Sequence, residues 1–172
     1  GHRHPMQLAT PDALALLAEK ISSKSACVGI SGLGCVGLPL ALRFAEVGLE
    51  VLGFDIDAGK VQQLNAGGSY IERLMPSSIQ KALEQGFEAT SDFARTTEVD
   101  ALIICVPTPL NAHREPDLSF ITDTIDAALP YMRAGQLVSL ESTTWPGTTD
   151  EVLAPRLRAY GLKPGENCAL VF

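Results

Sequence analysis

A glycine-rich turn between two strand-like segments constrains the fold of this chain more than any other feature. The run Gly32-x-Gly34-x-x-Gly37 follows a short apolar segment and opens an amphipathic stretch. A second short apolar segment then ends in Asp55. This order of strand, glycine turn, helix, strand and acid is typical of the first half of a doubly wound, dinucleotide-binding sheet. It predicts a dinucleotide site at the turn.

Each glycine of the turn meets a different steric requirement. We expect Gly32 to let the chain turn sharply, Gly34 to let bare backbone approach a pyrophosphate, and Gly37 to bring the helix close to the sheet. The free N–H groups that open the helix would then face the phosphates. Asp55 would accept hydrogen bonds from the adenosine ribose and repel a 2′-phosphate, which favours NAD over NADP. The alternative is a glycine turn that binds no ligand.

Composition and charge limit the classes of protein this chain can be. Of its 172 residues 46% are hydrophobic and 19% charged, which suits one substantial core. A net charge of -7 without a dense Lys/Arg stripe disfavours nucleic acid as a partner. No apolar run approaches the roughly 20 residues of a membrane helix, and no signal peptide is recognisable. We therefore expect a cytoplasmic protein that is not attached to a membrane.

No metal site is predicted from the cysteines or from the N-terminus. The chain has four cysteines, none of them in a Cys-x-x-Cys pair: Cys27, Cys35, Cys105 and Cys168. Because they lie mostly in apolar, strand-like segments, we expect buried free thiols rather than disulfides. Residues 1–5, which include two histidines, resemble a remnant of cloning. A single domain is expected over residues 6–172.

The rest of the chain alternates between helical and strand-like patterns. Helices are expected over residues 10–21, 38–47, 58–66, 76–85, 118–132 and from 149 onward, with Pro155 bending the last of them. Strands are expected over residues 27–31, 51–55, 87–90, 101–106, 136–140 and 168–172. This alternation predicts an α/β fold, a doubly wound, Rossmann-type parallel sheet of about six strands in the order 3-2-1-4-5-6.

Two of the later strands run into polar loops. The strand over 101–106 leads into Pro107-Thr108-Pro109, and the strand over 136–140 leads into Glu141-Ser142-Thr143-Thr144. Ligands of doubly wound sheets bind outside the carboxyl ends of the strands. Both loops are therefore expected at the same edge as the glycine turn.

Four ordered segments resemble the nucleotide-sugar 6-dehydrogenases, over a region from about Ala26 to the end of the chain. They are GLGCVGLPLA (32–41), FDID (54–57), ICVPTPLNAHREPDLS (104–119) and LESTTWPGTT (140–149). The resemblance implies a two-step oxidation of the C6 alcohol of a UDP-sugar to a carboxylate, with two NAD and one water. The amino-acid sequences of the last two segments are more similar to those of the UDP-N-acetylhexosamine enzymes than to those of the UDP-glucose enzymes.

The same resemblance implies which residues bind the cofactor. Those that would line the pyrophosphate are Gly32, Gly34, Cys35, Val36 and Gly37, with Asp55 on the adenosine ribose. Cys35 departs from the larger aromatic residue that is common at its position, so the fit there would be looser.

Three further residues are implied at the two ends of the cofactor. Lys60 would lie near the adenosine, and Thr108 and Thr143 would face the nicotinamide. Thr143 is also the one candidate for an auxiliary catalytic role, holding a water or the reacting oxygen. The alternatives are a solvated surface lysine for Lys60 and local turn-capping hydroxyls for the threonines.

The family's nucleophilic cysteine, its dimerisation helix and its UDP-binding domain have no counterpart in this sequence. We therefore expect the chain to be the cofactor-binding part of a longer enzyme and inactive alone. The intact enzyme would be a homodimer or a higher homo-oligomer. The alternatives are the cofactor domain of a UDP-glucose 6-dehydrogenase and a free-standing, non-catalytic module that binds NAD.

Overall fold

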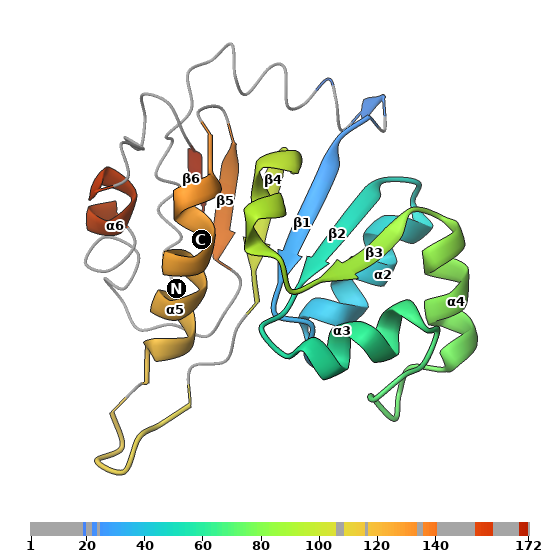
Figure 1. Cartoon of the computed structure of the whole chain (residues 1–172), viewed down its shortest axis with the longest axis horizontal. Helices are drawn as coiled ribbons and strands as arrows, with labels where there is room; N and C mark the ends of the chain where they lie inside the picture. The colour runs from blue at the N-terminus through green and yellow to red at the C-terminus, as the bar shows by residue number, and fades with distance from the viewer. Residues whose placement is uncertain are drawn as a thin grey trace.

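A parallel sheet organises the fold (Figure 1). The computed structural model describes residues 19, 22–23, 25–105, 109–115, 117–133, 136–140, 154–159 and 169–171. The strands are β1 (Cys27–Ser31), β2 (Glu50–Phe54), β3 (Phe87–Thr90), β4 (Ala101–Ile104), β5 (Leu137–Leu140) and β6 (Ala169–Val171). They form a 6-stranded sheet in the order β3-β2-β1-β4-β5-β6, and every neighbouring pair is parallel. The predicted strand order is confirmed.

Helices cover both faces of this sheet (Figure 1). They are α2 (Gly37–Glu46), α3 (Ala58–Asn65), α4 (Pro76–Glu84), α5 (Ser119–Ala128) and α6 (Ala154–Ala159), with the 3₁₀ turns η1 (Phe93–Glu98) and η2 (Leu129–Tyr131). Leu52 and Phe54 of β2 pack in one core with α5, whereas Val51 packs in the other core with α2 and α4. Because neighbouring residues of β2 enter opposite cores, the strand is buried on both sides.

Local sequence signals explain where α3 and α4 begin and where α4 ends, and both helices occur in the predicted segments. The carboxylate of Asp57 accepts hydrogen bonds from the N–H groups of Gly59 and Lys60 at 2.9 and 3.2 Å and so caps α3. Pro76 stands in the first turn of α4, where its missing N–H is not needed. Gly86 follows α4 with φ +111°, a conformation that favours glycine.

One predicted helix differs from that observed, and two others lie partly outside the described residues. The helix expected over 118–132 becomes a 3₁₀ turn at Leu129, because Pro130 supplies no N–H to continue the α-helical pattern. The last described helix, α6, contains Pro155, and the earlier part of the helix expected from 149 onward lies outside the described residues, so the bend at Pro155 stays a prediction. The helix expected over 10–21 lies almost entirely outside the described residues.

The side chain of Asn65 covers the outer edge of β3. Its amide nitrogen donates to the carbonyl of Ala89 at 2.8 Å, and its oxygen accepts from the N–H of Ala89 at 3.0 Å. On the other side of the strand, the carbonyl of Thr90 accepts from Asp55 beyond the end of β2. Asn65 thus pairs both polar groups of a backbone unit that faces away from β2.

A fully buried amide joins η1 to the segment before β5. Gln136 is 0% exposed, and its Nε2 donates to the carbonyls of Thr96 and Val99 at 2.7 and 2.6 Å. Its Oε1 accepts from the N–H of Arg133 at 2.7 Å. Every polar atom of this side chain is therefore satisfied without water.

Replacing Gln136 by Leu should lower the free energy of unfolding by about 3 kcal/mol, because two buried carbonyls and the partly buried N–H of Arg133 lose a partner. Urea denaturation followed by circular dichroism measures the change. Gln62→Leu on the exposed side of α3 is the matched control and should stay within about 0.5 kcal/mol of the unchanged chain. A loss at Gln136 no larger than that of the control would contradict the assignment.

Candidate dinucleotide site

The glycine turn is anchored to the end of the neighbouring strand. Gly32 directly follows β1 and has φ +94°, which L side chains rarely adopt. Its N–H donates to the carbonyl of Phe54, the last residue of β2, at 2.8 Å. The sharp turn predicted at Gly32 is therefore present, and it starts at the carboxyl edge of the sheet.

Gly37 brings the first turn of α2 against the glycine turn itself. A β-carbon at Gly37 would lie 1.7 Å from the carbonyl oxygen of Gly32 and 3.2 Å from the Cβ of Cys105. No side chain fits at the first of these distances. The close approach predicted for this glycine is confirmed.

Gly34 shows the opposite environment, because a β-carbon there would meet no heavy atom within 4 Å. The φ angle of Gly34 is not positive. Neither packing against the described residues nor backbone conformation therefore requires glycine at this position. The space that a side chain would fill is the space a pyrophosphate needs if bare backbone is to approach it.

Four consecutive N–H groups of the turn have no acceptor among the described residues. Among the described residues, none accepts a hydrogen bond from the N–H of Gly34, Cys35, Val36 or Gly37. The N–H groups of the first helical turn have no partner inside the helix, and the helix dipole adds positive charge at the same end. This donor set fits the diphosphate of a dinucleotide.

Cys35 and Val36 form the outer tip of the turn. Val36 is 63% exposed and Cys35 is exposed, so the expectation of a buried thiol is wrong at Cys35, which stands in the turn and not in a strand. Cys105 is buried, as expected. Cys27 is half-buried, and its burial together with nearby Glu50 raises its pKa to about 11, so this thiol is protonated at neutral pH.

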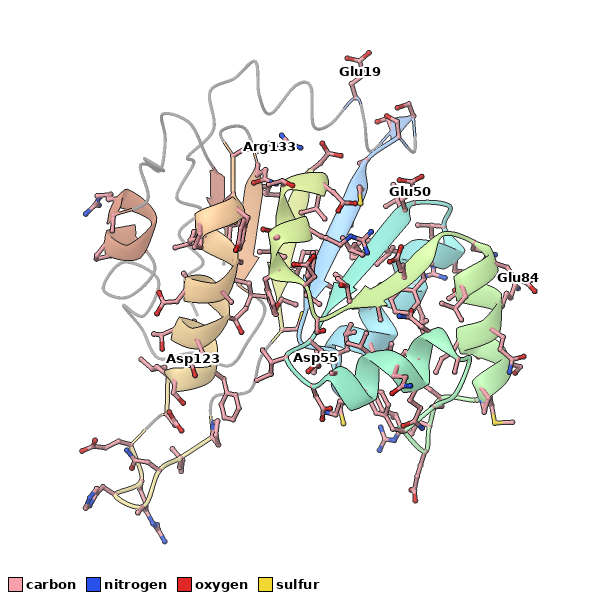
Figure 2. The ribbon with its side chains drawn as sticks, in the orientation of Figure 1. Glu19, Glu50, Asp55, Glu84, Asp123 and Arg133 are labelled. Atoms are coloured by element: carbon pink, nitrogen blue, oxygen red, sulfur yellow. The ribbon has the colours of Figure 1, made fainter. Side chains whose placement is uncertain are left out.

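Asp55 joins the glycine turn to the end of β2. Figure 2 shows Asp55 at the carboxyl end of this strand, opposite the end that carries Glu50. One oxygen of the Asp55 carboxylate accepts from the N–H of Leu33 at 3.0 Å, and the other accepts from the N–H of Asp57 at 2.9 Å. Each oxygen keeps a second lone pair, so the carboxylate can still accept hydrogen bonds from two ribose hydroxyls.

Tyr70 is a residue of this region that the sequence motifs did not indicate. Its hydroxyl donates a hydrogen bond to the carbonyl of Leu33, between Gly32 and Gly34 of the turn. Burial and the negative charges of Asp55 and Asp57 raise the pKa of Tyr70, so its hydroxyl keeps the proton it donates.

Lys60 lies on Tyr70 and is not a fully solvated lysine. Its ammonium nitrogen is 5.3 Å from the centroid of the Tyr70 ring, within the range of a cation–π contact. Lys60 is the third residue of α3 and is partly buried. Its predicted position near the adenosine end of the site remains a prediction.

The two threonines predicted on the nicotinamide side, Thr108 and Thr143, lie outside the described residues, and their roles stay predictions.

The loop over 109–115 projects from the domain (Figure 1, yellow). Its turn is held by Asn111, whose side-chain oxygen accepts from the N–H groups of His113 and Glu115 at 2.8 and 3.0 Å. These charged residues form an exposed turn, as expected for this segment.

The comparisons with known proteins agree with this geometry. The sequence profile described as "UDP-glucose/GDP-mannose dehydrogenase family, NAD binding domain" matches residues 26–168. The chain therefore belongs to the UDP-glucose/GDP-mannose dehydrogenase family and contains its NAD-binding domain. NAD is accordingly the cofactor of this domain.

Named relatives are dehydrogenases of acetylated sugar nucleotides. The chain is 36% identical over 128 residues to UDP-N-acetyl-D-mannosamine dehydrogenase of Escherichia coli (strain K12), covering 74% of this chain and 30% of that protein. It is 33% identical over 141 residues to UDP-N-acetyl-D-glucosamine 6-dehydrogenase of Pseudomonas aeruginosa, covering 81% and 33%. The chain thus spans about a third of the length of these relatives.

Solved structures similar to this chain are also sugar-nucleotide dehydrogenases. The crystal structure of NDP-N-acetyl-D-galactosaminuronic acid dehydrogenase from Methanosarcina mazei Go1 has a TM-score of 0.78 and 35% identity, over 90% of this chain and 36% of that chain. A ternary complex of GDP-mannose dehydrogenase from Pseudomonas aeruginosa has a TM-score of 0.78 and 29% identity, over 83% and 34%.

The described residues contain neither a candidate membrane span nor a candidate metal site. No helix among them is both long and apolar enough to cross a membrane. Within the same part of the chain, no group of three or more His, Cys, Asp or Glu side chains is placed to hold a metal ion.

Proposed function

We propose that this chain supplies the NAD site of a nucleotide-sugar 6-dehydrogenase acting on a UDP-N-acetylhexosamine. The observation that carries the NAD site is the open space at Gly34, in a turn whose N–H groups have no acceptor among the described residues and whose Leu33 N–H binds the carboxylate of Asp55. Family membership supports the dehydrogenase activity of the whole protein. Relatives named for N-acetylmannosamine and N-acetylglucosamine support the substrate class.

The proposed reaction converts a primary alcohol into a carboxylate by removing four electrons. Its balance is one alcohol, two NAD⁺ and one water giving one carboxylate, two NADH and three protons. Bound NAD⁺ supplies a hydride acceptor at its nicotinamide ring. In this proposal the turn from Gly32 to Gly37 binds the diphosphate and Asp55 orients the adenosine ribose, while Thr143 holds a water or the reacting oxygen.

Calorimetry on the purified chain tests the cofactor site. Titration with NAD, NADP and UDP-N-acetylglucosamine should give binding of NAD and weaker or absent binding of NADP, because the Asp55 carboxylate repels a 2′-phosphate. Absence of NAD binding would contradict the proposal. For the intact enzyme, two NADH per sugar are expected, and a higher kcat/KM with UDP-glucose than with the acetylated sugars would contradict the proposed substrate class.

Replacing Asp55 by Asn should weaken NAD binding about five-fold and reduce the discrimination against NADP. The new side chain carries an NH₂ group, which cannot accept a hydrogen bond, in place of one of the two carboxylate oxygens, and the negative charge that repels a 2′-phosphate is gone. Calorimetric titration with both cofactors measures the two effects.

Asp57→Asn is the matched control, since it removes a carboxylate two residues away and Asn caps helices as well as Asp does. It should leave both affinities within about two-fold. Unchanged affinities in Asp55→Asn would remove Asp55 from the site.

We also propose that the intact enzyme is a cytoplasmic homodimer or higher homo-oligomer. The three described cysteines are free, and the exposed thiol of Cys35 suits a reducing compartment. The oligomeric state follows from the family resemblance, and sedimentation velocity of the intact enzyme tests it.

A further inference from the structure

The residue between the first two glycines of the turn is held at three points. The Leu33 side chain is 0% exposed and lies against Gly53 of β2, where an added β-carbon would be 2.8 Å from a Leu33 methyl carbon. The N–H of Leu33 donates to Asp55, and the carbonyl of Leu33 accepts from the hydroxyl of Tyr70. The contacts with Gly53 and Asp55 position the residue, and the hydrogen bond from Tyr70 fixes its carbonyl.

The carbonyl of Leu33 and the N–H of Gly34 belong to the same peptide group. In a planar trans peptide these two groups point in opposite directions. Because Tyr70 holds the carbonyl, the N–H of Gly34 is directed away from Tyr70. None of the described residues accepts a hydrogen bond from this N–H.

Glycine at position 34 makes this peptide easy to rotate, since glycine populates conformations that are closed to other residues. Rotation by half a turn would exchange donor for acceptor and present a carbonyl oxygen where an anion must bind. An anionic ligand would be repelled by that oxygen. The orientation of this one peptide therefore matters for a diphosphate and much less for an uncharged ligand.

We propose that Tyr70 is a positioning residue that holds the Leu33–Gly34 peptide with its N–H toward the diphosphate of the cofactor. Lys60 supports this role, because its ammonium group lies over the Tyr70 ring and restrains it. The inference rests on the proposed NAD site. Tyr70 acts through the backbone of the turn and does not itself touch the cofactor.

Binding by Tyr70→Phe tests the proposal, because phenylalanine keeps the ring under Lys60 and removes only the hydroxyl. Affinity for NAD and for ADP should fall about five-fold, the worth of one net hydrogen bond, while affinity for adenosine should not change. Adenosine lacks phosphates, so it separates an effect on the diphosphate from a general loss of structure. Tyr131→Phe, which removes an exposed hydroxyl from η2, is the matched control and should leave all three affinities unchanged.

Two results of this titration would overturn the proposal. They are an unchanged affinity for NAD and ADP, and an equal loss for adenosine. If the unmodified chain does not bind NAD, the proposed function fails instead, so the two failures are distinguishable.

A second measurement uses the unmodified chain and does not depend on the folding of any variant. In a ¹⁵N–¹H correlation spectrum, ADP should shift the Gly34 amide resonance strongly, whereas adenosine should not. A Gly34 resonance that does not respond to ADP would overturn the proposal.

Discussion

Gly34→Ala should abolish measurable NAD binding and leave the domain folded. A β-carbon at Gly34 meets no protein atom within 4 Å, so the fold accepts it, but it occupies the space that the diphosphate requires. We expect an affinity loss of about 100-fold or more. Because alanine restricts the unfolded chain more than glycine does, the free energy of unfolding should rise by about 0.5 kcal/mol.

Calorimetry and urea denaturation of the same Gly34→Ala sample measure the two quantities. The expected signature is a loss of cofactor binding together with equal or higher stability, which separates a ligand-imposed glycine from a structural one. Retained NAD affinity would show that the cofactor does not approach this backbone, and the proposed site would be wrong.

Gly37→Ala should have the opposite result, a large loss of stability. Its β-carbon would lie 1.7 Å from a backbone carbonyl oxygen, so α2 or the turn must move. Both pack tightly, because Leu38 and Ala41 of α2 are fully buried. We expect the free energy of unfolding to fall by about 4 kcal/mol.

Urea denaturation measures the Gly37→Ala effect, with Gly34→Ala as the matched control, since both changes add one methyl group to the same turn. Equal stabilities of the two variants would show that α2 shifts freely and that the close approach at Gly37 is not required.

The glycine turn and Asp55 could be predicted from the sequence because the requirements that select them are local. Gly32 is selected by a positive φ, Gly37 by contact with a backbone atom five residues earlier, and Asp55 by its place at the end of a strand. Strand order could also be predicted, because chain connectivity and handedness leave few arrangements for alternating strands and helices.

Tyr70 could not be predicted in this way, because its partner lies 37 residues away in the sequence. Their contact depends on how the chain returns between α3 and α4, which no periodic pattern records. Gln136 was expected inside a strand, yet its side chain pairs with η1, and such pairing is specified only by the packed structure. The predicted burial of Cys35 is wrong, because this residue stands in the glycine turn between β1 and α2, where its apolar neighbours do not cover it.

The contact between Asn65 and Ala89 has a consequence for association between molecules. An uncovered edge strand is a template on which a foreign strand can add and extend the sheet. At β3 the N–H and carbonyl of Ala89 are already paired with a side chain of the same molecule. An incoming strand would have to displace Asn65 before it could pair there, so this margin of the sheet resists polymerisation by strand addition.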